Sequence, residues 1–135
     1  MRCAFIIDQS LPLGLIANTA AILAMTLGKT RPDLLGHDVS DAEGFRHRGI
    51  TSIVLPILSS DADGLMALRE RAETHAVDGL EVIDVTETAQ RAKSYIAYEE
   101  RIGEMRHDEL RYLGLCLFGP APLVRSLSGN LPLIK

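Results

Sequence analysis

Two aspartates, Asp8 and Asp84, each follow a short apolar run that is typical of a β-strand. Where two such strands run parallel, their carboxyl ends meet at the same end of the sheet, and ligands gather there. Neighbouring carboxylates can divide the roles of acid and base or bind a cation, but each can equally cap a helix or face solvent in a turn. We predict that Asp84 is the principal ionisable group of a site, as a polar anchor or general base.

The residues after Asp84, from Thr86 to Thr88, are typical of a helix N-terminus, where free N–H groups can also bind an anion. Glu87 would oppose such an anion. Asn18 is expected about one turn into a helix that begins at the same end of the sheet. Four polar residues are therefore predicted to hydrogen-bond a ligand: Asp8, Asn18, Thr86 and Thr88.

The segment from Met105 to Asp108 precedes the last predicted strand, which must run back from the end of the sheet that carries Asp84. The segment therefore has to pass the site. His107 lies in it and is the one side chain there whose ordinary titration falls near neutral pH. We predict a proton-transfer role for His107 beside Asp84.

Other catalytic signatures are absent from the sequence. It contains no Gly-x-Ser-x-Gly elbow, no supported Cys-His pair, and no Walker or Rossmann glycine pattern. A loop holds several side chains that could ligate a metal, but their spacing matches no known metal motif: His37, Asp38, Asp41, Glu43 and His47. We predict neither a metal nor a cofactor. His47, between Arg46 and Arg48, reads as part of a solvated loop.

Alternating strand and helix patterns predict an α/β domain, a three-layer sandwich in which a mixed sheet of four strands has helices on both faces. The strands are expected at 2–8, 50–58, 80–85 and 112–118. Helices are expected at 12–27, from Asp61 or Asp63 onward, from Thr86 or Thr88 to about 106, and as a short turn up to 127. The first three strands should be parallel, and the fourth should oppose the third.

The first predicted helix is apolar on nearly all sides, so a dimer interface with a second copy of the chain would bury the side that does not face the sheet. The uncharged run from Leu11 to Leu27 also has the length of a marginal membrane span or signal segment, but Pro12, Gly14 and Asn18 interrupt it. We therefore predict a homodimer and no membrane. The irregular loop from Gly28 to Gly49 is expected to be mobile or to cover a partner.

Length and composition favour one domain over residues 1–135, with 47% hydrophobic residues and 4% aromatic residues. The net charge of −4 disfavours nucleic acid as a partner, because such partners need a basic surface. Cys3 and Cys116 lie in apolar runs and read as buried thiols, which fits a reducing cytoplasm. The remaining partner class is a small molecule.

The tail of the chain resembles the type II peptidyl-tRNA hydrolase family. The matching segments are Leu115-Cys-Leu-Phe-Gly-Pro120, which is similar to that family's last strand and helix start, and Leu127-Ser-Gly-Asn-Leu-Pro-Leu133, which is similar to its ending. The segment 13–18 resembles the family's Gly-Lys-x-Ala segment, and 72–88 tracks its Asp-x-Gly-x-Thr motif. The stretch 41–50 is more similar to a bacterial family of domains of unknown function that shares this fold, and the chain is identified as a member of that group.

The resemblance implies that Asp84 and Thr88 occupy the motif's Asp and Thr positions, with Thr86 in place of its Gly. The family's catalytic lysine corresponds to Leu15, which can neither donate a proton nor neutralise a phosphate. We therefore expect a small polar or anionic ligand to be bound or processed at the crevice around Asp84. Two alternatives are a non-enzymatic dimeric interaction module and retained peptidyl-tRNA hydrolysis.

Overall fold

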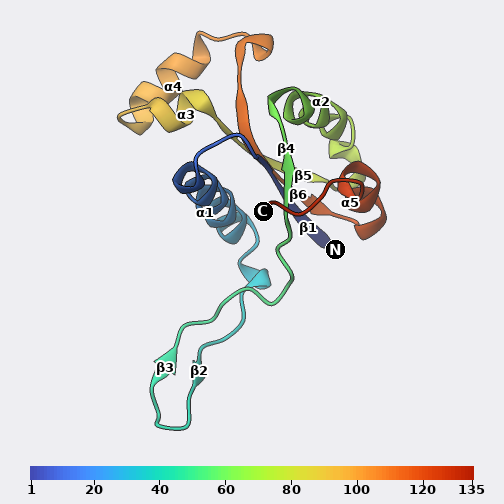
Figure 1. Cartoon of the computed structure of the whole chain (residues 1–135). Coiled ribbons are helices and arrows are strands. Elements are labelled where there is room, and N and C mark those ends of the chain that lie inside the picture. The colour runs from blue at the N-terminus through green and yellow to red at the C-terminus, as the bar shows by residue number, and fades with distance from the viewer.

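The computed structural model describes all 135 residues and is built on a four-stranded mixed sheet of order β4-β1-β6-β5 (Figure 1). Its strands are β1 (Arg2–Asp8), β4 (Ile57–Ser60), β5 (Glu81–Thr86) and β6 (Tyr112–Gly119). β1 is parallel to β4 and antiparallel to β6, and β6 is antiparallel to β5. β1 and β5 are therefore parallel and finish at the same end of the sheet, which confirms that part of the prediction.

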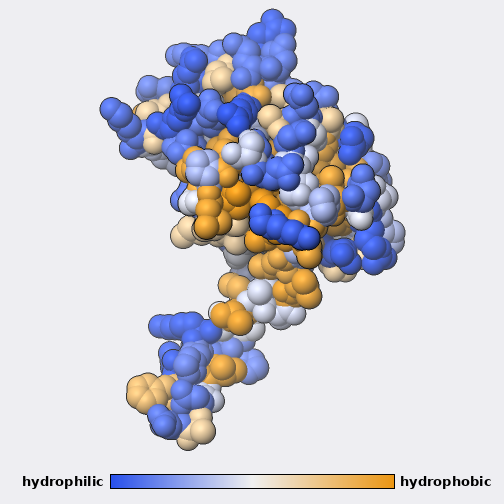
Figure 2. Space-filling view, in the orientation of Figure 1, coloured by the Kyte–Doolittle hydropathy of each residue, from blue (hydrophilic) through white to orange (hydrophobic).

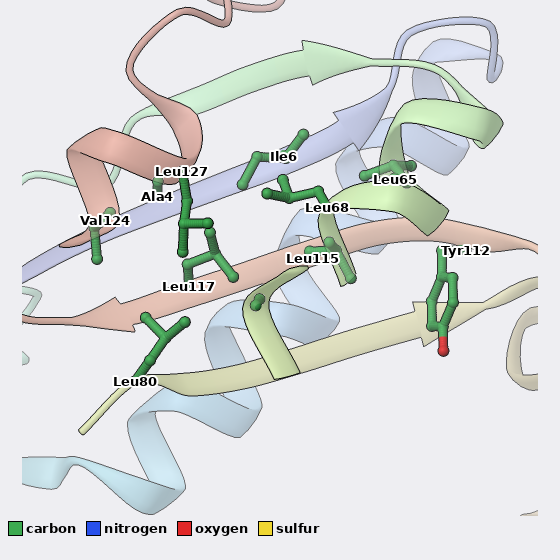
Figure 3. Packing of buried hydrophobic residues seen from close by; sticks show 11 residues of the cluster. Ala4, Ile6, Leu65, Leu68, Leu80, Tyr112, Leu115, Leu117, Val124 and Leu127 are labelled. Atoms are coloured by element: carbon green, nitrogen blue, oxygen red, sulfur yellow. The ribbon is translucent and has the colours of Figure 1, made fainter. Parts of the chain in front are cut away.

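Helices cover both faces of the sheet, so the predicted three-layer α/β sandwich is confirmed. The helix α1 (Leu13–Thr30) packs on one face, and α2 (Ala62–Glu73) and α5 (Ala121–Ser128) pack on the other. Figure 3 shows the larger core, in which side chains from α2 and α5 meet the sheet around Ile6, Leu115 and Leu117. After α5, the C-terminal tail returns to the sheet, where Leu133 bridges to Leu58 in β4.

Close contact between α1 and the sheet depends on Gly114 in β6. A Cβ atom at this position would lie 2.6 Å from Cγ2 of Thr19 and 3.2 Å from Cδ1 of Leu23. Thr19, Leu23 and Leu27 form the buried side of α1. By length and composition α1 could cross a membrane, with a mean hydropathy of 1.3, and 17% of it is buried inside the domain.

The predicted third helix is two helices, α3 (Glu87–Arg91) and α4 (Tyr95–Gly103), which corrects the sequence-based expectation of one helix up to about residue 106. The chain turns away at Ala92, whose backbone is extended, and Ser94 begins α4 by accepting a hydrogen bond from the Ala97 N–H at 3.1 Å. A cap of this kind satisfies backbone donors that a helix start leaves free. The two helices lie beyond the end of β5 (Figure 1).

Residues 28–56 differ most from the prediction. The helix α1 continues past Gly28 to Thr30, and the predicted strand at 50–58 is wrong, because only Ile57–Ser60 pairs with β1. Most of 50–56 is instead the return leg of an arm that projects from the domain (Figure 1). The arm ends in a small hairpin of β2 (Val39–Ser40) and β3 (Arg46–His47).

Side chains within the arm bond to one another. Asp41 pairs with His47 at 2.9 Å, and Asp38 accepts a hydrogen bond from the Gly49 N–H at 2.8 Å. Asp38 also pairs with Arg46 and Arg48. No group of three or more His, Cys, Asp or Glu side chains is arranged to hold a metal ion.

Three short 3₁₀ turns complete the chain: η1 (Pro32–Leu34), η2 (Ala76–Asp78) and η3 (His107–Glu109).

Cys3 and Cys116 are buried free thiols on the α1 side of the sheet, as predicted from their apolar surroundings. Their sulfur atoms are 3.6 Å apart. The hydrogen bond with Cys3 and burial both raise the pKa of Cys116 far above its ordinary value. Because the thiolate is the reactive form of cysteine, the raised pKa makes Cys116 a residue of the core and not of a reactive site.

Candidate functional site

Asp84 lies on the edge strand β5, in register with Leu115 of the central strand β6. Its carboxylate atom Oδ2 accepts a hydrogen bond from Nε of Arg69, in α2, at 3.2 Å. Its other oxygen, Oδ1, has no hydrogen bond from the protein, and the side chain is about a quarter exposed, at 26%. Asp84 is therefore held in position through one oxygen and has the other available to a ligand.

Arg69 is shared between Asp84 and Glu73, with which it also pairs. Partial burial alone would lower the pKa of Arg69, but the hydrogen bonds to Glu73 and Asp84 outweigh it and raise the pKa above its ordinary value. The guanidinium thus pairs with two carboxylates, through Nε and Nη1, and orients Asp84.

A pocket of about 330 Å³ lies between α1, β5 and the α3–α4 pair, and Asp84 is one of its lining residues. We call it the Asp84 pocket. Its lining also includes Lys93, Tyr95 and Tyr98. The remaining lining residues are mostly small or apolar: Ile22, Thr26, Val85, Ala89, Ala92 and Ser94.

Tyr95 and Tyr98 form an edge-to-face pair with ring centroids 5.5 Å apart and an interplanar angle of 80°. Burial, followed by the nearby charge of Asp84, raises the pKa of Tyr98, so its phenol stays protonated and can donate a hydrogen bond. Lys93 takes part in no ion pair within the chain. The lining of the Asp84 pocket therefore includes an acidic residue, a lysine without an ion pair and an aromatic pair.

His107 lines a second pocket, of about 490 Å³, on the α2 side of the sheet edge. Its ring contacts the Tyr112 hydroxyl at 3.3 Å through Nδ1 and lies 3.6 Å from Glu70 through Nε2. Arg69 also lines this pocket and bonds to Asp84. His107 and Asp84 are thus joined through Arg69, but they do not line the same pocket.

Asp8 is buried, at 1% exposed, and both of its carboxylate oxygens are occupied. Oδ1 accepts hydrogen bonds from the backbone and hydroxyl of Ser10, and Oδ2 accepts one from Arg111 at 3.2 Å. Arg111 also bonds to Glu87 at the start of α3. The structure places Asp8 in an ion-pair network that joins β1, β6 and α3.

The other predicted ligand-binding residues are dispersed. Thr86 is buried and caps α3 by accepting a hydrogen bond from the Ala89 N–H at 3.2 Å. Thr88 lines a third pocket, between α3 and α4, and donates to the sulfur atom of Met105. Asn18 lies on the exposed side of α1, where its side chain makes no hydrogen bond within the chain.

Four residues at this site were not singled out from the sequence: Arg69, Lys93, Tyr95 and Tyr98. Arg69 reads as an ordinary solvent-facing residue of α2, and the other three sit where a single continuous helix was expected. The available signal was Ser94, because serine is a strong N-cap and here marks the start of a second helix. The break between the helices brings Lys93 to the pocket wall.

Comparison with known proteins gives a family and a fold. The model of a family described as "Protein of unknown function (DUF2000)" matches residues 1–135. No curated protein is significantly similar to the chain. A solved structure of a protein of unknown function from Agrobacterium tumefaciens strain C58 is similar over 99% of this chain and 97% of that chain, with a TM-score of 0.90 and 14% identity. At that identity the similarity shows a shared fold.

Proposed function

The chain belongs to the DUF2000 family, and we propose that it binds a small polar ligand in the Asp84 pocket. The observation that carries this proposal is that Asp84, whose Oδ1 atom accepts no hydrogen bond within the chain, lines a pocket together with Lys93 and a tyrosine pair. Ligand sites in proteins are commonly concave, partly apolar and equipped with a few polar groups that fix the ligand's orientation. The Asp84 pocket has these properties.

The lining residues favour a ligand with groups of both polarities. Asp84 can accept a hydrogen bond from an ammonium or other donor group, and Lys93 can donate to a carboxylate or other acceptor. Tyr95 and Tyr98 supply an aromatic wall for the flat or aliphatic part of the ligand that joins these two polar groups. Small zwitterionic molecules, such as amino-acid derivatives, meet these requirements.

Binding is better supported than catalysis. The Asp84 pocket contains no nucleophile hydrogen-bonded to a base, the arrangement that covalent catalysis needs. His107, the predicted partner in proton transfer, lines the pocket on the other side of Arg69. We therefore assign Asp84 the role of polar anchor and give His107 no direct contact with this ligand.

We further infer a common origin with the type II peptidyl-tRNA hydrolase fold. Two features support it: α5 begins directly after Gly119-Pro120, and the tail around Leu133 returns to β4. Leu15 occupies the position of that family's catalytic lysine, and its side chain can neither carry charge nor transfer a proton. In this inference the fold is retained and peptidyl-tRNA hydrolysis is lost.

We propose a second copy of this chain as the protein partner. Ile22 and Met25 lie exposed on α1, and Lys29 is the only charged residue in the helix. An uncharged apolar surface of this kind is suited to a two-fold contact with itself. The same observation favours the alternative function, a dimeric interaction module whose pocket binds nothing.

A thermal-shift screen of amino-acid derivatives, nucleotides and small carboxylic acids tests the proposed ligand site. A ligand at a hundredfold excess over its dissociation constant stabilises the native state by about 2.7 kcal/mol. We expect at least one zwitterionic compound to raise the melting temperature of the wild type by clearly more than that of Asp84→Asn. Asp63→Asn, which removes an exposed carboxylate from α2, is the matched control and should respond like the wild type. A response that Asp84→Asn retains in full contradicts the proposal.

A further inference from the structure

A separate pocket of about 450 Å³ lies between α3 and α4, on the part of the surface that Figure 2 shows as strongly hydrophilic. Its lining is rich in cations, although the chain carries a net charge of −4. It shares only Ala92 and Lys93 with the Asp84 pocket. The lining residues are Glu87, Thr88, Arg91, Ala92, Lys93, Ala97, Arg101 and Met105.

The three cations of this pocket are weakly committed within the chain. Lys93 has no ion pair, and Arg101 has one long contact with Glu104, at 3.6 Å. Arg91 lies 3.8 Å from Glu87, the single acidic residue of the lining. The other oxygen of Glu87 is bound by Arg111 at 3.2 Å. An excess of positive charge is therefore left facing the pocket.

The hydroxyl of Thr88 is a fourth group of this pocket that can donate a hydrogen bond to an anion. This half-buried side chain donates its hydrogen bond to the thioether sulfur of Met105, at 3.1 Å. A thioether is a weak acceptor, so an anionic oxygen in the pocket would be a better partner for the hydroxyl. The donor can turn to such an oxygen without leaving a strong bond.

We propose that this pocket binds the phosphate group of a small phosphate monoester. Two guanidinium groups, one ammonium group and one hydroxyl provide more donors than a carboxylate with two oxygens can use. A phosphate group offers three terminal oxygens and close to two negative charges, and guanidinium matches its geometry. The site does not require the Asp84 pocket to be occupied, because Asp84 is not among its lining residues.

A polynucleotide is the competing source of phosphate. Polynucleotide binders neutralise several phosphates along a strand and normally present an extended basic surface. Here the cations converge on one pocket of an acidic chain. The arrangement therefore favours a single phosphate group on a small molecule.

Titrations followed by amide NMR, with inorganic phosphate and glycerol 3-phosphate as probes at constant ionic strength, test this inference. Neither probe carries an ammonium group, so we expect saturable shifts confined to the α3–α4 pocket, and succinate should bind more weakly than glycerol 3-phosphate. Arg91→Gln and Arg101→Gln should each weaken phosphate binding about fivefold, the loss of one charge-assisted contact at an exposed position. Both side chains are mostly exposed, so these changes leave the fold intact.

Two controls separate this inference from the proposed ligand site. Arg71→Gln removes an exposed arginine of α2 that makes no side-chain ion pair, and it should leave phosphate affinity unchanged. Asp84→Asn should also leave it unchanged, whereas it weakens binding in the Asp84 pocket. Wild-type affinity in both Arg91→Gln and Arg101→Gln would overturn the inference. So would equal binding of succinate, or displacement of phosphate by an oligonucleotide at lower concentration.

Discussion

Arg111 donates a hydrogen bond from Nη2 to the Oδ2 atom of Asp8 over 3.2 Å, although the two residues are 103 positions apart in the chain. Asp8 is buried at the end of β1, whereas the Arg111 side chain is 45% exposed. Through its other nitrogen, Arg111 also holds Glu87 at the start of α3. This pair therefore fixes the end of the sheet against the segment that builds both the Asp84 pocket and the α3–α4 pocket.

The Asp8 network predicts an acid-sensitive contribution to stability. Burial alone would raise the pKa of Asp8, but hydrogen bonds from Ser10 and Arg111 outweigh it and lower the pKa. A lowered pKa in the folded state stabilises the protein above the unfolded-state pKa, and that stabilisation is lost as the pH falls through the folded-state value. Asp8→Asn should reduce the free energy of unfolding by about 1–3 kcal/mol at pH 7.

Urea unfolding at a series of pH values measures this effect. The difference between wild type and Asp8→Asn should begin to shrink below about pH 4, the ordinary pKa of an aspartate in the unfolded chain, and should continue to shrink as the pH falls toward the lowered pKa of the folded state. Asp63→Asn controls for the loss of an exposed carboxylate. A difference that stays constant down to pH 3 would show that the charge of Asp8 does not stabilise the fold.

Gly114 predicts a steric test of how α1 packs on the sheet. Gly114→Ala should destabilise the protein by about 1–3 kcal/mol, because the new methyl group overlaps Thr19. Thr19→Ser removes the overlapping methyl group, so the double variant should recover part of the loss. Gly28→Ala, whose added Cβ meets no atom within 4 Å, is the control and should be close to neutral or stabilising. Additive losses in the double variant would be inconsistent with this contact.

The exposed apolar side of α1 predicts self-association. Met25 is 82% exposed, and a lysine in its place would bring a charge into a contact between two copies. Met25→Lys should shift the molecular mass in solution from dimer to monomer, as measured by sedimentation equilibrium. Val77→Lys, at an exposed position in η2, should not change the mass. A wild type that is monomeric at high concentration removes this proposal.

Leu15 predicts that the purified protein leaves peptidyl-tRNA intact. Its aliphatic side chain cannot stabilise a developing oxyanion or transfer a proton. Gel analysis of peptidyl-tRNA incubated with the wild type, beside a type II peptidyl-tRNA hydrolase as positive control, measures the activity. Complete turnover by the wild type would restore hydrolysis as the function.

The sheet could be predicted from the sequence because its strands carry strong local signals. The run Cys3–Ile7 is apolar throughout and Asp8 ends it, so the predicted strand 2–8 agrees with β1. The run 50–56 is also largely apolar, but it serves as the leg of the arm and places Ile53 and Leu55 against the α1-side core. Hydrophobicity alone does not distinguish a paired strand from an unpaired segment that packs on the core.

The site was only partly predictable. Strand polarity correctly placed Asp8 and Asp84 at the same end of the sheet, since that depends on topology alone. Which side chains line the same pocket depends on where a helix breaks and on how side chains pair, and the hydrophobic pattern of the sequence contains neither. The break at Ala92 builds the Asp84 pocket from Lys93 and Tyr95, and Arg69 separates Asp84 from His107.

The chain has three tyrosines and no tryptophan, so the tyrosine rings report directly on ligand binding at the Asp84 pocket. Tyr95 and Tyr98 line this pocket, whereas Tyr112 contacts His107 on the other side of Arg69. The most direct measurement is therefore an NMR titration of ring-labelled tyrosine with the compound that most raises the melting temperature. Saturable shifts of the Tyr95 and Tyr98 rings, with Tyr112 unmoved and affinity about tenfold weaker in Asp84→Asn, are the predicted result. A stabilising compound that leaves both rings unshifted, or that shifts Tyr112 alone, would contradict ligand binding at Asp84.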